Sequence, residues 1–301
     1  MNQCPDHRLL RQYTFALVDA SQREQIPAGI SSRSLASGAL SDSAELLPSL
    51  LVLGELNAQQ HAALVELLDA QCRAKEPPVT CALLNATCTA KRIQLHLASA
   101  QVINGPGTEK AWLRLHDPRV WLQLPRVYQA ADLRQVFGPV VTWTICLSGH
   151  WIETRPPEIN DPKQSIVLRR SGPPQWAKLQ RIGIVNRALA RLGLSDHDDV
   201  LKHSPALDDL ALRGQTRHQL QRTADLVEYV CLGWQISPRF DEHPMALRAI
   251  EEYRRTLAEE GDGAEQDASP IDALVAIPRE HWPRMRDDLQ TEHLGSAHGN
   301  Q

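Results

Sequence analysis

The hydrophobic pattern changes along the chain, and this change constrains the fold more than any other feature. Up to about residue 155, short apolar runs at 13–18, 46–53 and 80–84 alternate with stretches of helical periodicity. From Gln175 onward, apolar residues recur every three or four positions instead. Alternating strands and helices are typical of α/β layers, and a sustained helical period is typical of bundles. The sequence therefore predicts an α/β N-terminal lobe with a mixed sheet, followed by an all-α C-terminal lobe.

Proline placement and composition set the predicted domain boundaries. Residues 156–174 contain five prolines, which favours a linker that encloses a short strand at 166–168. Residues 259–269 (EEGDGAEQDAS) are acidic and small, which is typical of a segment without a packed core. We therefore expect an α/β domain at 1–155, a Pro-rich linker at 156–174, a helical lobe at 175–260 and a mostly flexible tail at 261–301.

The most distinctive stretch spans residues 111–144. It begins with an apolar run at 112–115, which predicts a strand, and continues through an Arg-x-His-Asp-Pro-Arg turn into a helix. Phe137-Gly138-Pro139 predicts the end of that helical region, and a strand follows at 140–147. Gly149-His150 then predicts a hairpin turn into a strand at 151–154.

The His116-Asp117-Pro118-Arg119 turn has two interpretations. In a catalytic one, Asp117 orients a histidine while Arg114 or Arg119 holds an anion. In a structural one, Asp117 caps the helix that starts at Pro118. No nucleophile, metal-ligand set, phosphate loop or dinucleotide fingerprint accompanies the turn. We therefore predict a structural brace, without catalytic residue, metal or cofactor, made of Arg114, Asp117, Pro118, Arg119 and Asp19. In this brace Arg114 pairs with Asp117 or Asp19.

Composition narrows the function classes. A formal net charge of -4 over 301 residues is too small to favour nucleic acid or an anionic membrane as the main partner. No apolar run approaches the roughly 18 residues that suggest a membrane span. The first residues are polar and lack the pattern of a signal peptide. These features favour a protein that stays in the cytoplasm.

A basic stretch marks the start of the helical region. Between Asp161 and Asp196 there are seven basic residues and no acidic ones. Arg187 and Arg191 lie opposite the apolar stripe of their predicted helix, which favours a solvent-facing position. The stretch is either a solvated helix face or a contact surface for an acidic partner. As partner-binding candidates we take Arg181, Arg187, Arg191, Trp176 and Trp234.

Several pieces of the chain together resemble one protein family. They are ALVDAS (16–21), LLPSLLVL (46–53), LHLASAQVI (95–103), LRLHDPRVWLQLP (113–125) and FGPVVTW (137–143). Their order and spacing resemble the bacterial type VI secretion effector-chaperone (adaptor) family, domain of unknown function 4123, over residues 13–145. The chain departs from the family pattern at Ser49, Ala98, Leu115 and His116. The later segment 229–250 is similar to the helical lobe often found in these chaperones.

The resemblance implies a non-enzymatic adaptor. Such a protein binds a toxic effector, a type VI secretion toxin, and helps to load it onto the VgrG spike or a PAAR-domain tip, without being secreted itself. The implied partners are proteins, and neither nucleic acid nor a membrane is expected. The alternative is a small-molecule-binding or hydrolytic α/β enzyme that uses the His116-Asp117 turn. A nucleic-acid-binding regulator is a third hypothesis.

Overall fold

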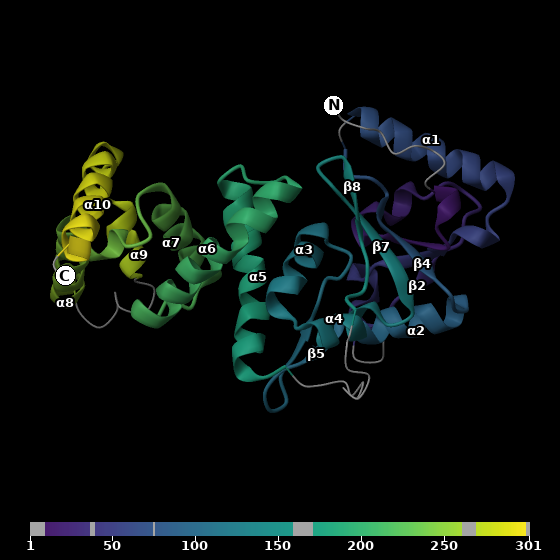
Figure 1. Cartoon of the computed structure of the whole chain (residues 1–301), viewed down its shortest axis with the longest axis horizontal. Coiled ribbons are helices and arrows are strands. Elements are labelled where there is room, and N and C mark those ends of the chain that lie inside the picture. Colours follow the sequence, from purple (N-terminus) through teal and green to yellow (C-terminus); the bar gives the residue numbers. More distant parts are fainter. Residues whose placement is uncertain (1–9, 37–39, 75, 159–170, 261–268, 299–301) are drawn as a thin grey trace. The chain divides into compact units, whose positions relative to one another are not determined.

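The computed structural model describes residues 10–36, 40–74, 76–158, 171–260 and 269–298 of the chain. Contacts between residues divide the chain into two units. The α/β unit comprises Met1–Leu179 and Asp196–Leu201, and the helical unit comprises Gln180–Ser195 and Lys202–Gln301. The predicted fold class is confirmed, because a sheet with helices precedes an all-helical region (Figure 1).

A six-stranded sheet forms the centre of the α/β unit, in the order β2-β3-β1-β4-β7-β8. All described pairings within it are antiparallel, whereas the sequence predicted a mixed sheet. The reason is that β1 lies between β3 and β4, so the helix that links those two parallel strands does not link neighbours. The strands are β1 (Phe15–Val18), β2 (Arg33–Ser34), β3 (Ser49–Val52), β4 (Thr80–Ala86), β7 (Val140–Leu147) and β8 (His150–Thr154).

The two faces of this sheet carry different cores. On one face, Leu64 and Leu68 of α1 (Ala58–Ala74) pack with alternate strand residues such as Leu51 and Leu83. On the other face, Trp143 of β7 is fully buried. Figure 1 shows α1 above the sheet and α2 (Ala90–Ala100) below it. Short 3₁₀ helices connect these elements: η1 (Leu10–Gln12), η2 (Ala20–Gln25), η3 (Ser41–Leu46) and η4 (Leu53–Glu55).

The stretch at 111–144 forms the predicted helix and final strand but not the predicted first strand. The strand β6 (Lys110–Trp112) pairs only with β5 (Val102–Asn104), in a separate two-stranded sheet, and residues 113–117 form a turn. The chain then enters α3 (Pro118–Val127) and α4 (Ala130–Phe137), and Gly138 ends α4 as predicted. The hairpin between β7 and β8 is also confirmed. Its turn residues, Ser148 and Gly149, both have positive φ.

Helices make up the described part of the helical unit. The helix α5 (Pro173–Arg191) begins in the α/β unit and continues to the predicted end near Gly193, which has φ 73°. The remaining elements are α6 (His197–Arg217), α7 (Thr223–Gln235), η5 (Phe240–Glu242), α8 (Pro244–Glu260), α9 (Pro270–Val275), η6 (Arg279–His281) and α10 (Trp282–His298).

Two predicted boundaries differ from the structure. Pro173 and Pro174, assigned to the linker, form the first turn of α5, where proline costs no hydrogen bond. The predicted strand at 166–168 lies outside the described residues. The tail expected to be mostly flexible contains α9 and α10. A Ser269 capping box starts α9, and buried Leu274 and Met285 hold the segment in the core.

The backbone at Gly138 packs closely against the ring of His96 in the α/β unit. Gly138 has φ 54°, and a Cβ placed there would lie 2.2 Å from Cε1 of His96 in α2. The His96 ring is held there because its Nε2 lies 2.9 Å from the carbonyl oxygen of Val136. Burial lowers the pKa of His96. Only glycine fits this position, since both the dihedral angle and the approach of the ring exclude a side chain.

We expect Gly138→Ala to lower the free energy of unfolding by about 3 kcal/mol or more, because backbone strain and a steric clash add. Gly149→Ala is the control. Gly149 has φ 79° but no atom within 4 Å of its added Cβ, so only strain of about 1 kcal/mol applies. Urea denaturation of both variants, and of Gly138→Ala in a His96→Ala background, measures the difference. Equal losses at the two glycines, or no relief by His96→Ala, would contradict the clash.

Candidate functional site

Asp117 stabilises the turn that precedes α3 by accepting hydrogen bonds from the backbone and the side chain of Arg119. Its Oδ1 accepts a hydrogen bond from the backbone N–H of Arg119 at 3.0 Å, which caps the helix whose first residue is Pro118. The Arg119 side chain also donates to both carboxylate oxygens, at 3.1 and 3.0 Å. This pairing with Asp117 raises the pKa of Arg119. The three residues thus form a brace at the start of α3, in the region where the sequence predicted one.

Asp19 is paired with a different residue from the one predicted. The Nε2 atom of His116 lies 3.0 Å from Oδ2 of Asp19, and the His116 side chain is only 2% exposed. The contact with His116 holds the pKa of Asp19 well below its usual range. Arg114, predicted to pair with Asp19 or Asp117, instead places its guanidinium carbon 5.5 Å from the ring centre of Trp112. The strand ends at Trp112, so Arg114 lies in the turn rather than in a strand.

These contacts bear on the catalytic interpretation of the turn. Both oxygens of Asp117 accept hydrogen bonds from within the fold, and His116 is buried beside Trp112, with ring centres 5.8 Å apart. A described pocket of about 320 Å³ lies elsewhere, lined by Arg11, Tyr13, Leu53, Gly54, Leu56, Ala58 and His61. Within the described ranges, no three His, Cys, Asp or Glu side chains are grouped as metal ligands. The geometry of the turn is that of a buried structural contact.

Two of the predicted partner-binding residues are buried. Arg181 is 3% exposed, and its Nε and Nη2 donate to the two carboxylate oxygens of Asp208 in α6, at 2.8 and 3.2 Å. Trp176 is 6% exposed, and a Cβ at Gly105 would lie 2.7 Å from its indole ring. The prediction of a surface role was wrong for both residues. Arg181 neutralises a buried carboxylate. Trp176 packs the first turn of α5 against the turn between β5 and β6.

The other three predicted residues lie at or near the surface of the helical unit. Arg187 is exposed, and Arg191 is exposed but forms an ion pair with Glu228. Trp234 is half-buried, and its ring meets that of His203 edge to face at 4.8 Å. Of the three predicted arginines, Arg187 and the partly neutralised Arg191 are therefore the ones that reach the surface.

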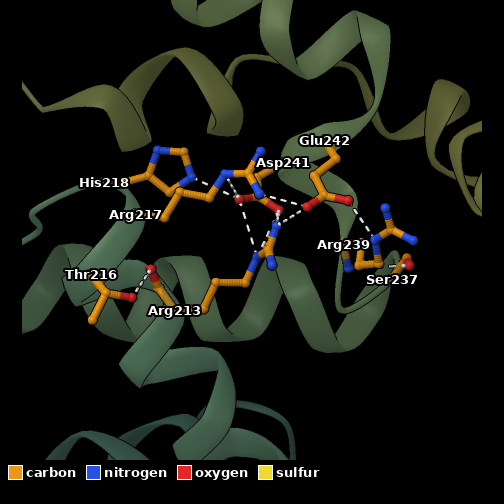
Figure 2. Close-up of polar contacts among 8 residues, drawn as sticks. All are labelled: Arg213, Thr216, Arg217, His218, Ser237, Arg239, Asp241 and Glu242. Carbon is orange, nitrogen blue, oxygen red and sulfur yellow. Dashed lines mark hydrogen bonds and ion pairs between the residues drawn. The ribbon is translucent and has the colours of Figure 1, made fainter.

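The helical unit contains a polar cluster that was not predicted, centred on the fully buried carboxylate of Asp241 in η5 (Figure 2). From α6, Arg213 donates through Nη2 to Oδ1 of Asp241 at 2.8 Å. Arg217 approaches Oδ2 at 3.4 Å, and Nε2 of His218 lies 2.8 Å from the same oxygen. Burial alone would raise the pKa of Asp241, but the hydrogen bonds from His218 and Arg213 outweigh it and lower the pKa to about 2.

Glu242, the next residue, forms the outer layer of the cluster. Its Oε1 accepts hydrogen bonds from Arg213 at 2.8 Å and from Arg217 at 2.5 Å, and its Oε2 is paired with Arg239. The hydrogen bond from Arg213, together with those from Arg239 and Arg217, lowers the pKa of Glu242 to about 2. Figure 2 shows the arginines converging on the two carboxylates from separate segments. We name Arg213, Arg217, His218, Arg239, Asp241 and Glu242 the arginine cluster.

Local sequence explains how the arginine cluster is assembled. Arg213 and Arg217 are four residues apart on α6, so they lie on one face, and Arg217 also suits the negative end of that helix. On the other segment, Phe240 is fully buried, 5.1 Å from the ring centre of Tyr229, which fixes η5 beside α7. The sequence signal was an Arg-x-x-x-Arg-His pattern followed by Arg-Phe-Asp-Glu.

No family model, curated protein or solved structure matches this chain. Among the described residues, none of the helices is both long enough and apolar enough to cross a membrane.

For the turn before α3, we expect Asp117→Ala to lower the free energy of unfolding by about 2 kcal/mol, since it removes a helix cap and the partner of Arg119. Arg114→Ala removes a cation–π contact and should cost about 0.5 kcal/mol. Chemical denaturation of both variants tests the assignment. A larger loss of unfolding free energy for Arg114→Ala than for Asp117→Ala would contradict this assignment and show that Arg114 is the main stabilising residue of the turn.

For the arginine cluster, we expect Asp241→Asn to cost about 3 kcal/mol at pH 6, because Arg213 and Arg217 lose the buried carboxylate that pairs with them. The control Asp209→Asn, at an exposed position of α6, should change stability by less than about 0.5 kcal/mol. Folding lowers the pKa of Asp241 from 3.8 to about 2, so about 2 kcal/mol of stability is present above pH 4 and lost as the pH falls toward 2. Denaturation curves should show that the difference in free energy of unfolding between wild type and Asp241→Asn decreases as the pH falls from 4 toward 2. An advantage that is constant from pH 6 to pH 2 would contradict the assignment.

Proposed function

We propose that this protein is a non-enzymatic adaptor. It binds a type VI secretion effector in the bacterial cytoplasm and helps to load that effector onto the VgrG spike or a PAAR-domain protein. The proposal begins with the resemblance of residues 13–145 to the effector-chaperone family. The observation that carries it is that the separate sequence pieces that make up this resemblance contact one another in the α/β unit.

Three contacts link these pieces. Asp19, from the piece at 16–21, meets His116 from the piece at 113–125. His96, from 95–103, packs against Gly138 from 137–143. Trp121 stacks on Trp143, with ring centres 3.9 Å apart. Short motifs that match a family by chance have no reason to meet in space, so these contacts support a common core built by the motifs.

The state of the His116-Asp117 turn supports an adaptor more than an enzyme. A general acid or base has to reach the reacting group of a substrate. Here His116 is 2% exposed, and Asp117 is engaged by Arg119 and by the backbone of α3. A hydrolytic enzyme that used this turn would have to open these contacts first.

The adaptor hypothesis predicts a stable complex with the effector encoded beside the gene of this protein. Tagged wild-type protein, co-expressed with that effector, VgrG and the PAAR-domain protein, should co-purify with the effector through size exclusion. Failure to capture any of these partners would refute the adaptor function. Arg187→Glu should weaken effector capture several-fold without lowering the melting temperature, since it reverses an exposed charge. The control Arg254→Glu, on α8, should leave capture unchanged.

A further inference from the structure

The solvent side of the arginine cluster differs from its buried side. Asp241 is fully buried, whereas the side chains of Arg217 and Arg239 are 41% and 54% exposed. We propose that the exposed guanidinium groups of Arg217 and Arg239 form a binding site for an acidic peptide segment of a partner protein. The proposal rests on the adaptor function, of which it specifies a contact surface.

The two arginines are held in place before any partner arrives. Arg217 contacts Asp241 and Glu242 at the same time, and Arg239 is paired with Glu242. Since both contact the same Glu242 carboxylate, their guanidinium groups lie close together. A long arginine side chain normally loses rotamer freedom when it binds an anion. Here the contacts with Asp241 and Glu242 already restrict the two side chains in the free protein. Binding an anion therefore costs less side-chain entropy.

Hydrogen-bond donors remain on the exposed side. Arg217 uses Nε and Nη1 in its contacts, and Arg239 uses Nε. Among the described residues, Nη2 of Arg217 and both Nη atoms of Arg239 have no hydrogen-bond acceptor. A carboxylate matches the planar donor geometry of such groups and binds two of them at once.

The charge balance of the arginine cluster favours an anion. Three arginines share two carboxylates, so a positive charge is left over even when His218 is neutral. The outer carboxylate, that of Glu242, is only 22% exposed and already shows how the site holds an acidic side chain. A partner carboxylate would bind the remaining Nη donors of Arg217 and Arg239 from the solvent side.

An acidic peptide suits the site better than a nucleic acid. Proteins that bind single strands combine basic groups with aromatic rings on which bases stack. The aromatic residues beside the arginine cluster, Tyr229 and Phe240, are fully buried and present no face to solvent. The chain as a whole also carries a formal net charge of -4.

The test measures binding of a fluorescein-labelled hexaglutamate peptide to the full chain by fluorescence anisotropy at low salt. Wild type should bind saturably, and Arg239→Ala should weaken binding about fivefold, as expected for loss of a charge-assisted hydrogen bond. Arg239→Lys should recover only part of the loss, because lysine keeps the charge but not the planar donors. Arg248→Ala, at an exposed position of α8, removes the same charge and should change affinity less than twofold. Thermal melts confirm that each variant is folded.

Three results would overturn the site. They are the absence of saturable hexaglutamate binding, an equal effect of Arg239→Ala and Arg248→Ala, and tighter Arg239-dependent binding of a hexathymidine oligonucleotide than of the peptide. Co-purification of the effector with wild type and with Arg239→Ala distinguishes failure of this site from failure of the adaptor function. Effector capture that is unchanged in Arg239→Ala would overturn the role of the site in partner binding while leaving the adaptor function intact. Failure of wild type to capture any partner, with hexaglutamate still bound through Arg239, would refute the adaptor function alone.

Discussion

Asp241, Asp208 and Arg181, the buried ionic groups that organise the helical unit, each lie in contact with an opposite charge. A carboxylate or guanidinium taken out of water costs several kcal/mol unless such a partner is present. Asp241 has Arg213, and Asp208 has Arg181. In the α/β unit, buried His116 meets Asp19. Each pair joins segments far apart in the sequence, so the charge pairing helps to decide which segments pack together.

This requirement explains why charged residues that looked available for partners are not. Arg181 belongs to a run of basic residues, but it lies on the buried side of α5, where Asp208 needs a cation. Arg191, one helical turn beyond Arg187, is partly neutralised by Glu228. A run of like charges along a helix therefore does not define a basic surface, because the helix distributes these charges between core and solvent.

The parts of the fold that could be predicted from the sequence have local causes. Asp117 before Pro118 is a cap for α3, and Gly149 supplies the backbone freedom that a two-residue hairpin turn requires. The sheet order has no local cause, because β1 pairs with strands on both sides that come later in the chain. The arginine cluster was missed for the same reason. Asp241 is separated by 28 residues from Arg213 and by 23 from His218. Hydrophobic periodicity predicts local structure and does not predict contacts between residues so far apart in the sequence.

The predicted tail shows the limit of composition as a signal. Residues 259–269 are acidic and small, but the helices that follow have a Ser269 capping box and a few large apolar residues. Met285 is fully buried and Leu274 nearly so, although charged residues surround Met285 in the sequence. A short amphipathic helix needs only a few such residues when a bundle is present to receive them. The contacts of α9 with α7 and α8 provide such a bundle, which composition alone does not reveal.

The two carboxylates of the arginine cluster have separable roles. Asp241 has no exposed surface and contacts three basic side chains, so removing its charge disturbs the fold itself. Glu242 is more exposed and lies at the rim, between Arg217 and Arg239. An incoming carboxylate can bind the remaining Nη donors of these two arginines without disturbing the pairing of Arg213 with Asp241. The buried carboxylate thus anchors Arg213 in the fold, while Glu242 orients the two exposed arginines toward a partner carboxylate. This division allows the same arginines to stabilise the helical unit and to bind a partner.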